Sequence, residues 1–421
     1  MNRTEPLLPD NPTPTIKAPL TAEETARILS AWQLTPAQHS SILQTQILPA
    51  ELHPFLPSTT NNTNQLPTIT ASTTRPKAVL ILGQTGAGKT RLAPLLLSAL
   101  TSLSPTRTPL HLIADTFKTY HPFYTTCLSQ HPNLASRLTR RDAAAWLLAV
   151  CTHAAQAHHP AVLVETACRR PSDFQRIVKA FATEGYDVRV VVLAVPPALS
   201  RLGILVRYWR RLPEAGSQRH GLPVRLTPRV VHDESWEGLR VAVGWVDRLL
   251  LLLFRATHSP ASSTTIGTTG TAGAGGGRKE GDKEEEEEEL EEEEEEEGRV
   301  ERVVVVRRNG GVVYDSETSR RSKGQEEAGE AGEVSWALEQ EWVKGLSVEE
   351  RRTAEEDLQM LRGLGDPDVD REIDEVEGLL AELGSHEPVG NVVPFDAVNF
   401  VSTSVVRLPH CLDILGHHVG H

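Results

Sequence analysis

Residues 78–90 read AVLILGQTGAGKT, and this stretch decides the fold. Its first five residues form a continuous apolar run, which predicts a buried strand. GQTGAGKT (83–90) matches G-x-x-x-x-G-K-[ST], a pattern that forms a phosphate-binding loop when it stands between a strand and a helix. The helical sequence RLAPLLLSAL (91–100) follows at once, so the motif has that context. We therefore predict a P-loop that binds the phosphates of a nucleotide.

Each residue type in this loop has a physical task. Glycines let backbone N–H groups wrap around a phosphate, and the N-terminus of the following helix adds a favourable dipole. Lys89 is expected to bridge the β- and γ-phosphates of ATP, and the Thr90 hydroxyl to hold Mg²⁺. The alternative, a Gly-rich turn without a ligand, would need neither Lys nor Thr at these places. The expected nucleotide-binding residues are Gly83, Gln84, Thr85, Gly86, Ala87, Gly88, Lys89, Thr90 and Arg91.

Further apolar runs alternate with helical sequence at LHLIA (110–114), AVLVE (161–165) and VRVVVLAV (188–195). Such alternation indicates a parallel sheet covered on both faces. In RVVVVRRNGGVVYD (302–315), Asn309-Gly310 between two Val-rich arms predicts a β-hairpin. An isolated hairpin is marginally stable in water, so we expect it to join the same sheet. The predicted fold class is α/β, a doubly wound, mostly parallel P-loop NTPase sheet with helical N- and C-terminal additions and a disordered acidic insertion.

Composition divides the chain into segments. The P-loop domain spans 75–256, and the hairpin at 300–316 closes it after an insertion at 257–299. The insertion is Gly-rich and then Glu-rich, and we expect it to be disordered because it cannot bury enough apolar surface. The other expected segments are a disordered start (1–20), a small helical segment (21–55), a linker (56–74), an acidic helical segment (334–384) and a tail (385–421). Capping-box patterns begin the helical segments at Thr21, Thr35 and Ser347.

Charge and composition narrow the class of protein. The chain has 43 Lys and Arg against 56 Asp and Glu, but residues 75–257 alone carry 24 basic and 11 acidic residues. A basic body suggests an anionic ligand. The four cysteines are far apart, which indicates neither a disulfide framework nor a zinc ribbon, and we expect them to be reduced. The start of the chain lacks a secretory pattern and no apolar run could span a bilayer, so we expect a soluble, cytoplasmic protein without membrane contact.

Two carboxylates stand where predicted strands end. Asp115 follows LHLIA, and Glu165 ends AVLVE and is followed by Thr166. Open α/β sheets bind their ligands at this carboxyl edge. There Asp115 could accept the proton of an attacking hydroxyl or help to hold Mg²⁺, and Glu165 could bind substrate. The alternatives are an N-cap role for Asp115 and an ordinary surface position for Glu165.

Residues 200–233 are rich in arginine. Phosphoryl transfer needs cations to offset charge on the equatorial oxygens, and a helical lid often carries them. A basic solvated face is the alternative for most of the set, and we expect only two or three to be catalytic. The set comprises Arg201, Arg207, Arg210, Arg211, Arg219, Arg225 and Arg229.

The motifs GQTGAGKT, ADTFKTYHP, LVET, VLAVPPALSRLGILVRY and RLTPRVVHD occur in an order and at spacings that resemble the zeta toxin family of P-loop kinases. Bacterial members of that family phosphorylate UDP-N-acetylglucosamine. The resemblance covers about 75–256 and resumes at 300–316. It implies that Lys89 binds phosphate, that Asp115 is the catalytic base, and that Arg207 and Arg225 contact the transferring phosphate. It also implies that Glu165, with the adjoining Thr166, lies on the substrate side.

Two departures from the family lie on the substrate side. Thr166-Ala167-Cys168 stands where the family often has a Gly-rich turn, and Ala149 stands near the position of a family glutamate. We therefore expect a kinase that uses ATP and Mg²⁺ and phosphorylates a hydroxyl of a small molecule, with a sugar nucleotide such as UDP-N-acetylglucosamine as one candidate. The alternatives are a silent nucleotide-binding scaffold, whose acidic segments would engage a protein partner that no motif identifies, and a polynucleotide or RNA-end kinase. Nucleic acid is disfavoured because aromatic stripes for stacking bases are lacking.

Overall fold

The computed structural model describes residues 21–56, 75–105, 107–210, 226–258, 299–322, 332–363, 367–384 and 393–402. Six strands form one sheet in the order β2-β3-β1-β4-β5-β6. They are β1 (Lys77–Leu82), β2 (Leu110–Ile113), β3 (Ala161–Thr166), β4 (Asp187–Ala194), β5 (Arg302–Arg307) and β6 (Val312–Asp315). Every neighbouring pair is parallel except β5 and β6, which form the antiparallel hairpin. The predicted α/β class with a mostly parallel sheet is therefore confirmed.

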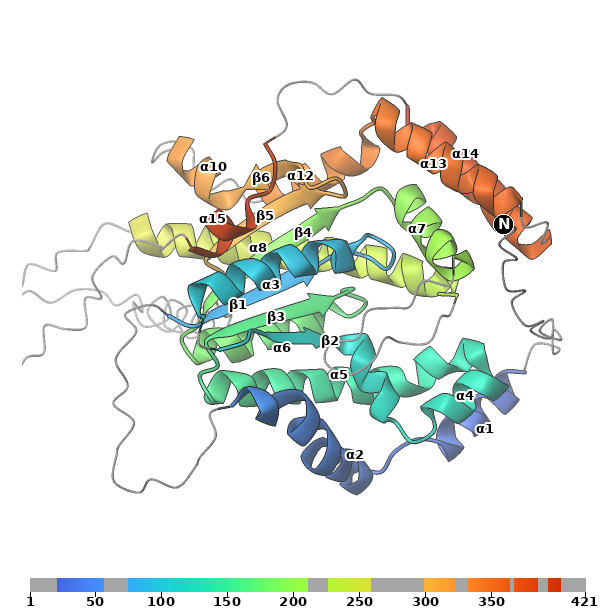
Figure 1. Ribbon diagram of the computed structural model, residues 1–421, viewed down its shortest axis with the longest axis horizontal. Helices are drawn as coiled ribbons and strands as arrows, with labels where there is room; N and C mark the ends of the chain where they lie inside the picture. The colour runs from blue at the N-terminus through green and yellow to red at the C-terminus, as the bar shows by residue number, and fades with distance from the viewer. Residues whose placement is uncertain are drawn as a thin grey trace, which may run out of the picture.

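Helices cover both faces of the sheet (Figure 1). One apolar core lies between the sheet and α3 (Lys89–Leu103), α7 (Pro197–Trp209), α13 (Val348–Arg362), α14 (Pro367–Glu382) and α15 (Ala397–Ser402). The other core lies between the sheet and α5 (Pro132–Gln156), α6 (Pro171–Thr183), α8 (Arg229–His258) and α12 (Glu333–Val343). Shorter elements complete the order: η3 (Ala114–Tyr120), α4 (Tyr124–Gln130) and α10 (Ser316–Ser322).

The N-terminal addition consists of α1 (Ala22–Ala31), α2 (Pro36–Ile42), the π-helical η1 (Leu43–Leu52) and the short η2 (His53–Phe55). The capping boxes predicted at Thr21 and Thr35 are both present, as is the one at Ser347. α15 is a helix that the sequence pattern did not reveal, and it packs on α3. The segments expected to be disordered at 1–20 and in most of 257–299 lie outside the described residues, as do most of the linker at 56–74 and the end of the tail.

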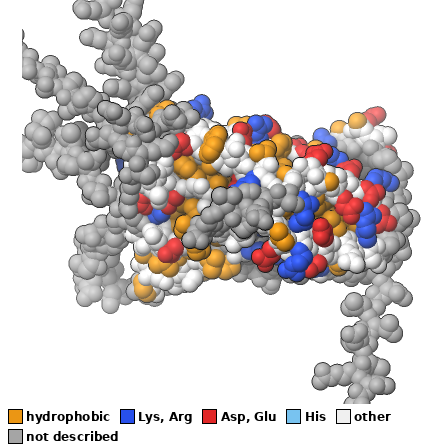
Figure 2. Space-filling model, turned by 90° about the horizontal axis from the view of Figure 1, so that it is seen from above, with side chains coloured by type: hydrophobic (Ala, Val, Ile, Leu, Met, Phe, Trp, Pro, Cys, Tyr) orange, Lys and Arg blue, Asp and Glu red, His pale blue; other side chains and the backbone are white. Residues whose placement is uncertain are grey.

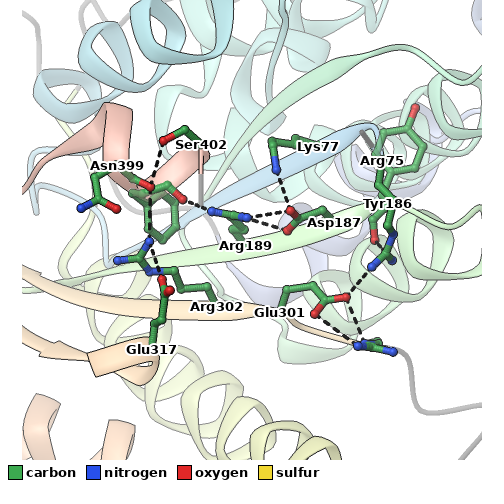
Figure 3. A network of polar contacts seen from close by, with 12 residues as sticks. Arg75, Lys77, Tyr186, Asp187, Arg189, Glu301, Arg302, Glu317, Asn399 and Ser402 are labelled. Carbon is green, nitrogen blue, oxygen red and sulfur yellow. Dashed lines mark hydrogen bonds and ion pairs between the residues drawn. The ribbon is translucent and has the colours of Figure 1, made fainter. Parts of the chain in front are cut away.

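A buried polar network joins the C-terminal elements to the sheet (Figure 3). Arg189, on β4, is wholly buried, and Asp187 accepts two hydrogen bonds from its guanidinium at 2.8 and 2.7 Å. Lys77 of β1 donates to the same carboxylate at 2.6 Å. Arg189 also donates to the carbonyl of Phe400 on α15. Because a buried charge needs partners, this network holds α15 and the neighbouring strands together.

Within the described residues, no helix is long and apolar enough to cross a membrane. The three described cysteines, Cys127, Cys151 and Cys168, are buried and free, as expected for reduced thiols. Burial raises the pKa of the Cys127 thiol to about 11, so this thiol stays protonated near neutral pH.

Acid should destabilise the fold through His159, which is fully buried and hydrogen-bonds the Ala161 carbonyl through Nδ1 (3.0 Å). Burial lowers the pKa of His159 to about 4 from an unperturbed 6.5. Between these values the unfolded chain binds a proton that the folded chain does not, so stability falls as the pH drops from about 6.5 to 4. The loss attributable to this residue is on the order of 3 kcal/mol. Urea unfolding at stepped pH values measures it, and His159→Gln should flatten the curve; an unchanged pH dependence would contradict the assignment.

Candidate active site

The P-loop connects β1 to α3. Gly86 and Gly88 have φ of +83° and +99°, a left-handed conformation that favours glycine. A Cβ on Gly86 would come within 2.0 Å of the Ser200 carbonyl oxygen on α7, so only glycine fits there. The first N–H groups of α3 have no intrahelical acceptor and carry the positive end of the helix dipole. The loop therefore fits the phosphates of a nucleotide.

Lys89 is the first residue of α3, and its Nζ donates to the carbonyls of Gly83 (2.6 Å) and Gln84 (3.2 Å). Burial lowers the pKa of the ammonium. The charge of Glu165, followed by smaller effects of Cys168 and Asp115, acts in the opposite direction, and Arg207 lowers the pKa further. The structure thus brings Asp115, Glu165 and Arg207 into the electrostatic surroundings of the P-loop lysine.

Asp115 lies within the 3-10 helix η3, whose N-cap is Ile113, so the alternative that Asp115 caps a helix is wrong. Its carboxylate forms an ion pair with Lys118 three residues on, and the Asp115 side chain is 40% exposed. Lys118 is buried, and its Nζ lies 3.4 Å from Ser136 Oγ on α5. Lys118 was not among the residues predicted for the site, although its spacing from Asp115 in ADTFK was a usable signal.

Glu165, at the end of β3, is buried rather than on the surface, and its Oε1 lies 2.8 Å from His111 Nε2 on β2. The hydroxyl of Thr166 accepts a hydrogen bond from the Cys168 N–H at 3.1 Å. Cys168 has φ of +52°, which is unusual for a residue with a side chain. The chain therefore adopts a left-handed conformation after β3 at a residue that is not glycine.

Most of the described arginines around α7 contact acidic helices. Arg201 donates to Glu375 on α14 at 3.0 Å, Arg229 contacts the same carboxylate, and Arg210 donates to Asp357 on α13 at 2.7 Å. Figure 2 shows basic and acidic side chains intermixed at the end of the molecule where Figure 1 places α13 and α14. These arginines therefore support packing.

Arg207 is placed differently, because its Nη2 lies 3.4 Å from Thr227 Oγ1 and its charge acts on Lys89. It remains a candidate for contact with the transferring phosphate. Arg211, Arg219 and Arg225 lie outside the described residues, so the role expected of Arg225 stays a prediction.

A second basic cluster, which was not predicted from the sequence, lies around Glu234 on the side of β3. Glu234 on α8 accepts from Arg169 Nε at 3.0 Å and from Arg140 Nη1 on α5 at 3.3 Å. Burial lowers the pKa of Arg140, and the nearby Arg169 and Arg170 lower it further. The guanidinium groups of Arg140, Arg169 and Arg170 thus lie near a single carboxylate, that of Glu234. Such an excess of positive charge can attract an anion. The pair Arg169-Arg170 directly after β3 was the available signal.

A P-loop after the first strand of a mostly parallel sheet, with carboxylates at the ends of the next two strands, defines an α/β protein of the P-loop NTPase class. The sequence model of the zeta toxin family, described as "Zeta toxin", matches residues 61–254, and this part of the chain is a zeta toxin domain. Zeta toxins are P-loop kinases that use ATP. No curated protein matches the chain.

Among solved structures, one from a study of the PezAT chromosomal toxin–antitoxin system of Streptococcus pneumoniae is similar to this chain. The TM-score is 0.44 at 15% identity, over 82% of this chain and 98% of that one.

Proposed function

We propose that the protein is an ATP-dependent kinase that transfers the γ-phosphate of ATP to a hydroxyl of a small molecule in the cytoplasm. The observation that carries this proposal is the surroundings of Lys89, where the charges of Asp115, Glu165 and Arg207 act on the partly buried ammonium of the P-loop lysine. A phosphate site alone would suit any nucleotide-binding protein. A carboxylate and an arginine beside it are the groups that phosphoryl transfer requires.

Each residue then has a role. Lys89 and the first N–H groups of α3 bind the phosphates, and the exposed Thr90 at the second position of α3 would hold Mg²⁺. Mg²⁺, when bound, offsets negative charge on the β- and γ-phosphates. Asp115 accepts the proton of the acceptor hydroxyl, for which its partial exposure leaves room. Arg207, and by the family resemblance Arg225, offsets the charge that spreads over the transferring group.

The proposed acceptor is a sugar nucleotide such as UDP-N-acetylglucosamine. Glu165, which His111 contacts at 2.8 Å, would accept hydrogen bonds from sugar hydroxyls, with Thr166 beside it. The arginines around Glu234 supply positive charge for a diphosphate. Labelled ATP with either UDP-N-acetylglucosamine or an RNA oligonucleotide tests this reading. Label on the sugar nucleotide supports it, label on RNA replaces it with a polynucleotide kinase, and label on neither, with ATP still bound, favours the scaffold.

Asp115→Asn should lower phosphoryl transfer by roughly 10²-fold or more while ATP affinity changes little, because the amide keeps the shape but cannot take the proton. Initial rates with labelled ATP and calorimetric ATP binding measure the two quantities. Glu237→Gln is the matched control, since Glu237 is an exposed carboxylate on α8. Full transfer activity in the Asp115→Asn variant would exclude Asp115 as the base.

A further inference from the structure

A closed ring of hydrogen bonds joins the P-loop to α7 and α8. The Gln84 amide Nε2 donates to Ser200 Oγ at 3.2 Å, and this hydroxyl lies 2.7 Å from His232 Nε2. Ser235 Oγ donates to the His232 carbonyl at 2.7 Å and accepts from the backbone N–H of Thr85 at 3.1 Å. Because Gln84 and Thr85 are adjacent in the chain, the ring returns to the loop in which it begins.

His232 and Ser200 form the buried centre of the ring, and each has more than one hydrogen-bond partner. Asp233 can only accept, so His232 donates to it through Nδ1 at 3.0 Å. Burial lowers the pKa of His232, which favours the neutral imidazole. The Ser200 hydroxyl lies within hydrogen-bond distance of both His232 Nε2 (2.7 Å) and the Pro197 carbonyl (3.0 Å). The side chains of the ring are sealed from solvent, with Gln84, Ser200 and Ser235 at 0% exposure and His232 at 2%. The ring is therefore a fixed part of the interior.

The P-loop pattern leaves its second and third positions open, so phosphate binding by the loop does not by itself require these contacts. α7 approaches the loop so closely at Gly86 that a shift of the helix must move the loop backbone. Arg207 follows Ser200 by seven residues, which is two helical turns, and both lie on one face of α7. The ring therefore links the P-loop amides, which would bind phosphate, to α7, the helix that carries Arg207.

We propose that Ser200, His232 and Ser235 are positioning residues. Their hydrogen bonds hold the P-loop amides and Arg207 in fixed positions relative to each other, so that both can contact the nucleotide phosphates. The proposal rests on the kinase function proposed above. It assigns to α8 a part in nucleotide binding through buried contacts with the loop, in addition to its part in the apolar core.

The test uses the full chain and ATP with Mg²⁺. Ser235→Ala and His232→Leu should each raise the Kd for ATP about tenfold, since each removes a buried hydrogen bond that shapes the loop. His232→Gln keeps a polar atom near the position of Nε2 and should recover part of the affinity. Val246→Ala is the control, because Val246 is a buried residue of α8 outside the ring. It should lower stability to urea without changing the Kd.

Because the hydrogen bonds form a closed ring, the ATP affinity of a double variant provides a second test. Either substitution breaks the ring, so a second break should weaken ATP binding little further. The double variant Ser235→Ala/His232→Leu should therefore bind ATP only slightly more weakly than either single variant. The proposal would be overturned if wild type and both single variants bound ATP with equal Kd. It would also be overturned if Val246→Ala raised the Kd together with its loss of stability to urea. Additive losses in the double variant would overturn it as well. If the wild type itself binds no ATP, the kinase function fails and this proposal falls with it; the other outcomes leave the kinase function standing.

Discussion

Lys89→Ala should abolish ATP binding and phosphoryl transfer. Lys89 is the first residue of α3, whose N-terminus would face the phosphates, and its ammonium donates to the carbonyls of Gly83 and Gln84. Binding of ATP requires the ammonium to exchange these carbonyls for β- and γ-phosphate oxygens, and no uncharged side chain can supply that attraction. Calorimetry with ATP and Mg²⁺ and transfer of labelled phosphate measure the two losses.

Lys89→Gln separates charge from shape. Its amide can still donate to the loop carbonyls, so the loop should keep its conformation, yet ATP binding should be lost as in the alanine variant. The variant should also resist urea at least as well as wild type in the absence of nucleotide, because it no longer buries a desolvated charge. Retained ATP affinity in Lys89→Gln would show that the ammonium is not the phosphate ligand.

Local patterns were sufficient to predict the parts of the fold that depend on neighbouring residues. The four predicted apolar runs match β1 to β4 to within one residue at every end, and the three capping boxes begin helices as predicted. Asp115 and Glu165 could be predicted as site candidates because both follow parallel strands, and the carboxyl ends of such strands meet at one edge.

The features that sequence reasoning missed depend on contacts between distant residues. Arg201 and Glu375 are 174 residues apart in the chain. Only the folded structure shows that Arg201 pairs with an acidic helix, so the sequence could not separate it from an arginine that contacts phosphate. His111 occurs without a motif and His232 at the end of RLTPRVVHD, but the partners Glu165 and Ser200 lie on other elements, so neither contact could be read from the sequence. Arg189 interrupts an apolar strand, and its burial is tolerated because two groups accept from it. Asp187 is two residues away, but the Phe400 carbonyl is 211 residues away and could not be predicted.

Ending the chain after His258 should prevent stable folding, whereas replacing residues 261–296 with a short Gly-Ser linker should not. The truncation removes β5, which pairs along its length with β4 next to the centre of the sheet. The side chains of four valines on β5 are at most 1% exposed: Val303, Val304, Val305 and Val306. Burying each valine contributes about 1.5 to 3 kcal/mol, so their loss together is comparable with the roughly 5 to 15 kcal/mol that stabilises a typical domain.

The truncation also removes partners of charged groups that stay behind. Asp247 on α8 would lose the N–H groups of Val334 and Ser335, which donate to it at 2.8 and 3.0 Å, and Arg75 would lose Glu301. The linker variant keeps all of these contacts, and the entropy of closing a loop changes only slowly with its length. Soluble yield and urea unfolding followed by circular dichroism measure the difference. Equal stability of the two variants would mean that the sheet does not need β5, and that the kinase domain ends before the acidic insertion rather than enclosing it.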